Sequence, residues 1–205
     1  MNTFQYNSNM AKKTEAASMI VQSGEPVLHM HAKPVLLKQI GSKELNKVLS
    51  DMNQAVEYES DGVAIAAPQI GIPLRIFIIS KKAFLVDDVK KNGEEKDIPV
   101  RIPKNNLVFI NPEITKLSRK KVKVPEGCLS VRWLYGNTIR HEKATVRAYD
   151  EHGKRFTYGG SGLIAQIFQH ETDHLNGILF VDHATDIEEL TAEQIEDIQK
   201  KNSKR

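Results

Sequence analysis

The chain has 205 residues, of which 40% are hydrophobic and 27% are charged, and this length fits one domain with a well-buried core. The net charge of +3 and an aromatic content of 6% argue against a nucleic-acid-binding protein, because such proteins interleave a basic stripe with aromatic side chains. The longest apolar runs fall short of the roughly 18 residues that span a bilayer. The single cysteine, Cys128, excludes an intramolecular disulfide, so the cysteine content does not indicate an oxidising compartment.

Residues 1–18 are predicted to be a disordered leader, because Asn, Ser, Lys and Ala dominate them. They contain no apolar stretch of the kind that a secretory signal requires, and they lack arginine and include Glu15, unlike a mitochondrial transit peptide. We therefore expect a cytoplasmic protein with no membrane association. Residues 19–205 are expected to form one domain and to act as a monomer.

The first part of that domain predicts extended chain, then a helix, then a strand. Two runs punctuated by proline, at 26–28 and 34–37, favour extended segments. Ser42 is placed to cap a helix that ends near Glu59, with apolar residues at helical spacing between them. Residues 74–79 are typical of a buried strand.

A polar stretch separates this strand from the next one. Residues 81–106 are rich in Lys, Asp, Glu, Asn and Pro, which indicates a surface insertion, with a short strand at 84–86 inside it. Residues 107–110 predict a strand that Asn111-Pro112 ends. Residues 122–124 alternate in the same way and predict a further strand.

The last third predicts a hairpin and two helices. Residues 144–149 and 154–158 alternate on either side of a four-residue loop, as in a β-hairpin. The glycines between 159 and 162 are expected to break the chain before a helix that Asn176-Gly177 terminates. Thr191 opens a C-terminal helix through a capping box. This order of strands and helices predicts an α+β fold with largely antiparallel sheets.

A run of small residues at 61–71 ends in one polar side chain, Gln69. Small residues over such a length indicate backbone that approaches another group closely. A tightly packed core strand explains the same run. The sequence alone leaves both interpretations open.

The predicted helix before Asn176 contains Gln169-His170-Glu171-Thr172-Asp173-His174, and therefore the pattern H-E-x-x-H. Positions i and i+4 share one face of a helix, so His170 and His174 can bind one metal ion with Glu171 beside them as an acid or base. Leu163 and Ile167 continue the same face, which makes it apolar. Unpartnered imidazoles on such a face would be costly, so a metal site is favoured over a solvated pair.

The third ligand cannot be assigned from spacing. A catalytic metal site usually has three protein ligands, and the candidates are Cys128, another histidine or a carboxylate from a following segment, namely Glu188, Glu189, Glu193 or Glu196. The astacin-like pattern fails, because Phe180 stands where a third histidine is required. A lone cysteine is also a common small buried hydrophobe.

Three blocks together resemble the peptide deformylase family. Residues 62–69 resemble its G-x-G-x-A-A-x-Q block, residues 126–130 match E-G-C-L-S, and residues 169–174 match Q-H-E-x-D-H. The blocks occur in the family's order, and the resemblance covers roughly residues 20–183. It implies an α+β fold in which a central helix carries H-E-x-x-H and packs among antiparallel sheets.

The resemblance implies a single catalytic, metal-dependent domain in which Cys128, His170 and His174 bind one metal ion. The family's ion is Fe²⁺, with Zn²⁺, Ni²⁺ or Co²⁺ as substitutes. A thiolate with two imidazoles suits such ions better than Mg²⁺. A bound ion of this kind lowers the pKa of its water from 15.7 to about 7 and so provides a nucleophile at neutral pH.

The resemblance also implies the catalytic roles. Glu171 is then the general base and passes the proton to the leaving amine, while Gln69 and the backbone N–H of Leu129 stabilise the oxyanion. Glu126 is expected to pair with Arg140. The implied reaction is hydrolysis of the N-terminal formyl group of N-formylmethionyl nascent polypeptides.

The residues expected to line the substrate site are Val63, Ala64, Gly127, Leu163 and Ile167. The backbone of 63–65 is expected to pair with an extended peptide, and Leu163 and Ile167 to contact the methionine side chain. Two positions depart from the family pattern, since Ala64 replaces its second glycine and Arg132 replaces the usual proline. These changes bear on substrate fit more than on the chemistry.

Two other functions compete with deformylation. One is a metallopeptidase that cuts internal peptide bonds, and the other is a binding protein that keeps the fold without the activity. The basic tail 200–205 is a candidate for transient contact with ribosomal RNA, although a solvated terminus is the more usual explanation of such a tail. No sequence-specific nucleic-acid binding is expected.

Overall fold

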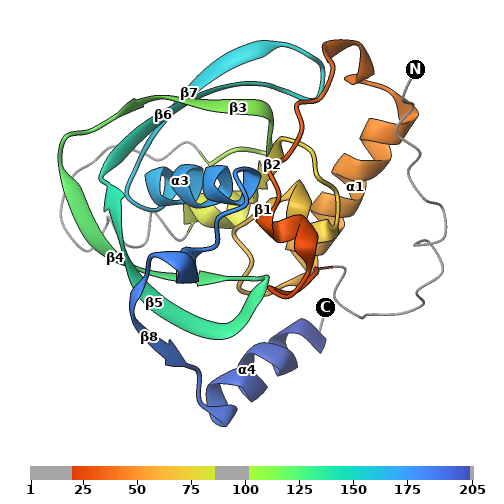
Figure 1. Ribbon diagram of the computed structural model, residues 1–205. Helices are drawn as coiled ribbons and strands as arrows, with labels where there is room; N and C mark the ends of the chain where they lie inside the picture. Colours follow the sequence, from red (N-terminus) through yellow and green to blue (C-terminus); the bar gives the residue numbers. More distant parts are fainter. Residues whose placement is uncertain (1–19, 86–101, 204–205) are drawn as a thin grey trace.

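The computed structural model describes residues 20–85 and 102–203, in which helices pack against two antiparallel sheets (Figure 1). The mixed helix and antiparallel-sheet fold expected from the sequence is confirmed. The expected leader at 1–18 and most of the expected insertion, 86–101, lie outside the described residues. Within the described ranges, no helix has the length and apolar character needed to cross a bilayer.

The larger sheet has five strands in the order β1-β2-β3-β6-β7, and every neighbouring pair is antiparallel. Its strands are β1 (Ala64–Ala66), β2 (Ile76–Ile79), β3 (Leu107–Leu117), β6 (Lys143–Tyr149) and β7 (Arg155–Ser161). All four residues of β2 are buried, as in a strand that is covered on both faces. The hairpin of β6 and β7 was predicted and is confirmed.

The smaller sheet has three strands in the order β4-β5-β8. They are β4 (Lys121–Cys128), β5 (Val131–His141) and β8 (Thr185–Glu189). The strands β5 and β8 were not predicted. All five residues of β8 are exposed, so β8 has no hydrophobic alternation for a sequence pattern to detect, and its pairing with β5 defines it.

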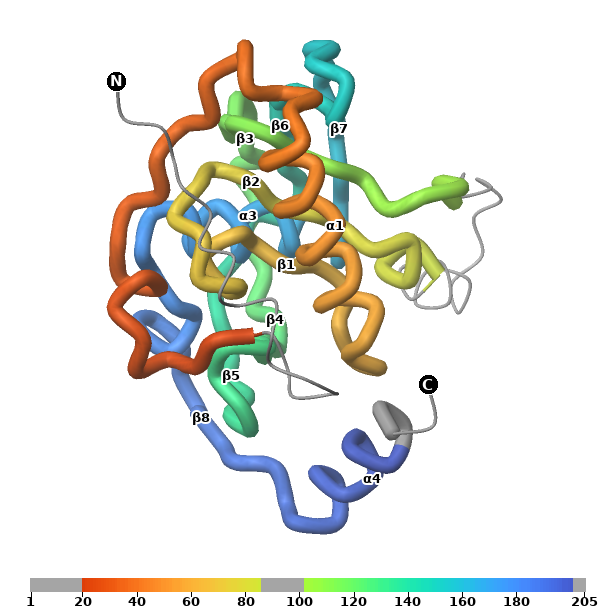
Figure 2. The backbone as a smooth tube through the Cα atoms, turned by 90° about the vertical axis from the view of Figure 1, so that its right-hand side faces the viewer, coloured from red at the N-terminus to blue at the C-terminus, as the bar shows by residue number. Residues whose placement is uncertain are grey.

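Helix α1 (Lys43–Tyr58) packs its apolar face against the start of the larger sheet. Ser42 caps it as predicted, because the Ser42 side chain accepts a hydrogen bond from the N–H of Leu45 at 3.2 Å. The C-terminal helix α4 (Ala192–Ser203) begins with the predicted capping box between Thr191 and Gln194. Figure 2 shows α4 at the lower end of the molecule, beyond β8.

Helix α3 (Leu163–Leu175) contains the H-E-x-x-H pattern and contacts strands of both sheets. Phe168 on its buried face packs against Phe77 and Phe109, with ring centroids 6.3 Å and 5.5 Å away. The helix ends before Gly177, as predicted. Gly177 has φ +75°, and a Cβ there would lie 2.7 Å from the carbonyl carbon of His29, so only glycine fits.

Several local predictions were wrong. Residues 26–29 form a short 3-10 helix instead of extended chain. Residues 81–85 are helical instead of leading into a strand at 84, and Phe84 is buried in the core. This first part of the expected insertion therefore belongs to the packed structure.

Two predicted breaks lie inside strands. β3 continues through Asn111-Pro112 because Asn111 adopts φ +51° at a register shift, and its side chain bonds the N–H and C=O of Val35 at 2.8 Å each. β7 continues through Gly159 and Gly160. A Cβ on Gly160 would lie 2.5 Å from Ile164 on α3, so this glycine permits close packing of the helix on the strand.

Candidate metal centre and active site

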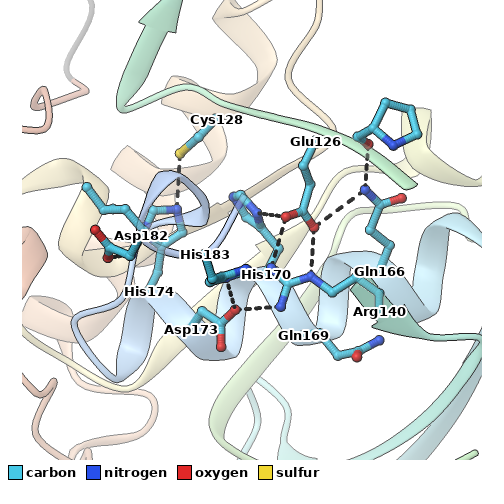
Figure 3. A network of polar contacts seen from close by, with 12 residues as sticks. Glu126, Cys128, Arg140, Gln166, Gln169, His170, Asp173, His174, Asp182 and His183 are labelled. Carbon is cyan, nitrogen blue, oxygen red and sulfur yellow. Dashed lines mark hydrogen bonds and ion pairs between the residues drawn. The ribbon is translucent and has the colours of Figure 1, made fainter. Parts of the chain in front are cut away.

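The side chains of Cys128, His170 and His174 converge on one point. Their sulfur and ring nitrogens all lie within 4.8 Å of one another, and Cys128 Sγ is 3.1 Å from His174 Nε2 (Figure 3). Cys128 ends β4, whereas the two histidines lie one turn apart on α3. The structure thus brings together the three residues that the resemblance indicates.

The local fold explains how Cys128 reaches the helix. A register shift between Gly127 and Cys128 interrupts the pairing of β4 with β5, and this irregularity turns the strand end toward α3. A Cβ on Gly127 would lie 2.5 Å from the ring of Tyr135. Glycine at 127 therefore lets the ring of Tyr135 lie directly against the strand that carries the sulfur.

The donor set fits a divalent transition metal ion. Two ligands of a four-coordinate ion at about 2.1–2.3 Å lie roughly 3.5 Å apart, so small side-chain adjustments suffice from the observed spacing of the cluster. The alternative carboxylate ligands do not join it. Within the described ranges, the donor atoms of histidine, cysteine and acidic side chains converge in this cluster. Glu188, Glu189, Glu193 and Glu196 are all exposed and lie outside it.

Glu126 and Arg140 form the expected ion pair, buried behind His170. The guanidinium donates to both carboxylate oxygens of Glu126, at 3.0 Å and 2.9 Å, and His170 Nδ1 lies 3.7 Å from Glu126 Oε2. Burial raises the pKa of Glu126, but His170 and Arg140 outweigh burial and lower this pKa to about 2. An ionised Glu126 therefore faces Nδ1 of His170, which directs Nε2 toward the cluster.

Asp173 and His183 extend this network, and the sequence analysis did not assign them a role. Arg140 donates to Asp173 Oδ2 at 2.6 Å, and His183 Nε2 lies 3.5 Å from the same oxygen. Figure 3 shows the chain of contacts from Glu126 through Arg140 to Asp173. The sequence could have indicated Asp173, since it lies three residues after His170, on the same side of the helix.

Glu171 combines deep burial with an unpaired oxygen. Its exposed fraction is 3%, and Glu171 Oε2 has no hydrogen-bond partner among the described residues. Burial raises the pKa of Glu171 to about 7; the charge of His170 opposes this shift, whereas the charges of Glu126 and Asp173 add to it. A carboxyl group with this pKa can accept and return a proton near neutral pH.

Gln69 lies in a 3-10 turn, residues Ala67–Ile70, directly after β1. Its Oε1 accepts the N–H of Ala66 at 2.8 Å, which fixes the orientation of the amide. Its Nε2 faces the cluster and donates to Cys128 Sγ at 3.5 Å and to Ser130 Oγ at 3.3 Å. Gln69 thus presents an amide N–H beside the cluster.

A cavity of about 490 Å³ opens beside Cys128 and His170. Besides these two predicted ligands, its lining includes the predicted catalytic residues and every residue predicted for the substrate site, namely Gln69, Leu129, Glu171, Val63, Ala64, Gly127, Leu163 and Ile167. Residues that were not predicted from the sequence to belong to the site also line the cavity, among them Asp61, Trp133 and Tyr135. These come from the turn before β1 and from β5, a strand that was not predicted.

Comparison with known proteins identifies similar chains. A family model described as Polypeptide deformylase matches residues 17–190. Peptide deformylase 1A, chloroplastic, from Solanum lycopersicum is 38% identical over 171 residues, which cover 83% of this chain and 61% of that protein. Peptide deformylase from Carboxydothermus hydrogenoformans is 37% identical over 172 residues, covering 84% of this chain and 96% of that protein. The chain therefore spans about three fifths of the plant relative.

A similar solved structure is that of the class I type b peptide deformylase from Acinetobacter baumannii with Met-Ala-Ser bound. The two chains are 33% identical with a TM-score of 0.65, over 80% of this chain and 97% of that one.

Proposed function

The chain belongs to the peptide deformylase family, and from this membership we propose that it hydrolyses the N-terminal formyl group of N-formylmethionyl nascent polypeptides. The observation that supports this most directly is the convergence of Cys128, His170 and His174 beside one cavity. The reaction breaks the C–N bond of a formamide and adds water, and it yields formate and a free N-terminal amine.

Cys128, His170 and His174 would hold one ion, for which we propose Fe²⁺, with Zn²⁺, Ni²⁺ or Co²⁺ as substitutes. One soft sulfur and two imidazole nitrogens suit these ions. When bound, such an ion supplies Lewis acidity that lowers the pKa of a coordinated water to about 7. Helix α3 contributes two ligands and the neighbouring acid, so we propose that it is the central helix of the fold.

Glu171 is proposed as the general base and then the general acid. Its unpaired Oε2 and its pKa of about 7 support this role. The ionised form of Glu171 can accept the proton of water. The same proton then passes to the amine nitrogen as the C–N bond breaks.

Gln69 and the backbone N–H of Leu129 are proposed to stabilise the oxyanion that forms on the formyl oxygen. The amide of Gln69 is held by Ala66, with Nε2 beside the cluster. A donor that is already oriented costs no reorganisation when negative charge develops. Because the amide is neutral, it leaves the charge of the attacking oxygen intact.

The peptide is proposed to pair with the open edge of β1. This strand ends the five-stranded sheet, and the neighbouring Val63 and Ala64 line the cavity, so backbone groups there can bond an extended chain. Leu163 and Ile167 are proposed to contact the methionine side chain. Met-Ala-Ser, bound in the similar structure, is the product that deformylation of formyl-Met-Ala-Ser would release.

We propose a monomer in the cytoplasm that meets its substrates as they leave the ribosome. The name of the tomato relative places that protein in the chloroplast, so fractionation of the native host is the test of location. The basic tail proposed to contact the ribosome lies partly outside the described residues. Ribosome co-sedimentation with and without residues 200–205 tests that contact.

The proposed reaction is tested by measuring amine release from formyl-Met-Ala-Ser, with casein digestion as the comparison. We expect rapid release of free amine and formate and no casein fragments. Casein cleavage without amine release would favour the metallopeptidase. Binding of formyl-Met-Ala-Ser without release of formate would favour the inactive binding protein.

A further inference from the structure

Arg132 ties together two walls of the cavity through a cluster of ion pairs. Its guanidinium donates to Asp61 at 2.6 Å and 3.3 Å and to Glu59 at 2.7 Å. Arg132 lies at the start of β5, whereas Glu59 and Asp61 lie in the turn between α1 and β1. We refer to these three residues as the Arg132 clamp.

The clamp is partly buried, and an aromatic ring packs against it. The side chains of Arg132, Glu59 and Asp61 are 15%, 6% and 24% exposed. The guanidinium carbon lies 4.8 Å from the centre of the Trp133 ring, within the range of a cation–π contact. Ion pairs shielded from water in this way constrain geometry more than exposed pairs do.

The Arg132 clamp lies beside the path that a bound peptide would follow. Asp61 and Arg132 both line the cavity. Gln69 lies beside the metal ligands after β1, whereas Asp61 lies before β1. A peptide paired with the open edge of β1, with its formyl end at Gln69, therefore runs toward Asp61 with its later residues.

The turn next to the clamp has little freedom of its own. The N–H of Gly62 bonds the C=O of Glu59 at 3.1 Å, and a Cβ on Gly62 would lie 3.0 Å from the carbonyl oxygen of Val56. The clamp joins this tight turn to β5 across the cavity. It can therefore fix the distance between the two walls on either side of the peptide.

We propose that the Arg132 clamp is a positioning device that holds the cavity walls for the second and third residues of the substrate. It thereby contributes to the binding of the peptide residues that follow methionine and not to the binding of formylmethionine itself. The inference rests on the proposed deformylation and deepens it, because it concerns chain length and not the hydrolytic step. The clamp touches no reacting atom, so it acts on peptide binding.

The test compares formyl-Met-Ala-Ser with formyl-Met as substrates of the metal-loaded enzyme. For Arg132→Ala we expect KM for the tripeptide to rise about tenfold with kcat within about threefold, and a much smaller change in KM for formyl-Met. The Kd of the product Met-Ala-Ser, measured by calorimetry, should rise by the same factor. Arg132→Lys should recover only part of the loss, since lysine lacks the planar fork that serves two carboxylates.

A charge exchange separates the clamp from a general loss of structure. Arg132→Asp should raise KM for the tripeptide further, and adding Asp61→Arg to that variant should restore most of it, because the exchanged pair has the same charges. Arg147→Ala is the matched control. It removes an exposed ion pair with Glu113 on the larger sheet, and it should leave the ratio of the two KM values unchanged.

Three results are decisive. An unchanged KM ratio in Arg132→Ala, with the wild type active, overturns the clamp and leaves the proposed function standing. An equal rise in KM for both substrates also overturns it, because the clamp would then hold the whole cavity. A wild type that releases no amine from either substrate removes the proposed function, and the clamp proposal falls with it.

Discussion

Glu171 lies in an environment that differs greatly from that of a surface acid. Its burial and its unpaired Oε2 stabilise the neutral form, which raises its pKa to about 7. Glu171→Gln keeps the side-chain volume and removes the proposed base. We expect kcat to fall by about 10²–10⁴ with metal content unchanged, as measured by amine release and elemental analysis. A variant with full activity would exclude Glu171 as the base.

Gln69 provides a second test at a single side chain. Gln69→Leu removes the N–H that lies beside Cys128 and preserves most of the side-chain volume. We expect kcat to fall by about 10²–10³, the usual cost of one oxyanion donor, while the ion stays bound. An unchanged kcat would remove Gln69 from the mechanism, and loss of the ion would assign it a purely structural role.

At the level of residues, sequence reasoning could place side chains together where their positions follow helical spacing. The pair His170 and His174 could be predicted because i and i+4 share a face. The assignment of Cys128 could not come from spacing, because a register shift at the end of β4 places it. The resemblance to a family supplied it. Arg132 was recognised only as a departure, because its partners lie about 70 positions earlier.

Helix α3 bears the proposed methionine pocket on one face. Ile167 lies there, 4% exposed and lining the cavity. Ile167→Ala should raise KM for formyl-Met-Ala-Ser about tenfold while changing KM for formyl-Gly-Ala-Ser much less, since buried methylene contacts of this kind are worth about 1–3 kcal/mol. Equal effects on both peptides would place the methionine side chain elsewhere.

The contact of α3 with β7 depends on one of two adjacent glycines. A Cβ on Gly160 would lie 2.5 Å from Ile164 Cγ2, whereas the nearest atom to a Cβ on Gly159 is 3.8 Å away. Gly160→Ala should therefore lower the free energy of unfolding by about 1–3 kcal/mol through overpacking. Gly159→Ala, the matched control, should change it by less than about 0.5 kcal/mol. Thermal unfolding of both variants is the measurement, and equal melting temperatures would contradict the packing argument.

At the level of elements, helices and strands with a regular local sequence pattern could be predicted, whereas those defined by their tertiary contacts could not. Ser42 and Thr191 act through local capping, so α1 and α4 could be predicted at their first residues. The strand β8 has only exposed residues, and its pairing with β5 defines it. Glycines in β7 suggested a break because the sequence does not show the helix that packs against them.

The proposed ion would join the two halves of the whole molecule. Cys128 ends a strand of the smaller sheet, and the histidines lie on α3, which packs against the larger sheet. Removal of the ion by a chelator should therefore lower the melting temperature, and re-addition should restore it. Free ion at a thousand times its Kd stabilises the folded state by about 4.1 kcal/mol. A melting temperature indifferent to the chelator would argue against a structural link.

The most direct test of the central claim is the metal content of protein purified without oxygen, measured together with deformylation of formyl-Met-Ala-Ser. Wild type should contain one equivalent of iron or a similar divalent ion per chain and release formate. Cys128→Ala and His174→Ala should lose both the ion and the activity, whereas Arg147→Ala should keep both. A Cys128→Ala protein that retains a full equivalent of ion and full activity would contradict the account.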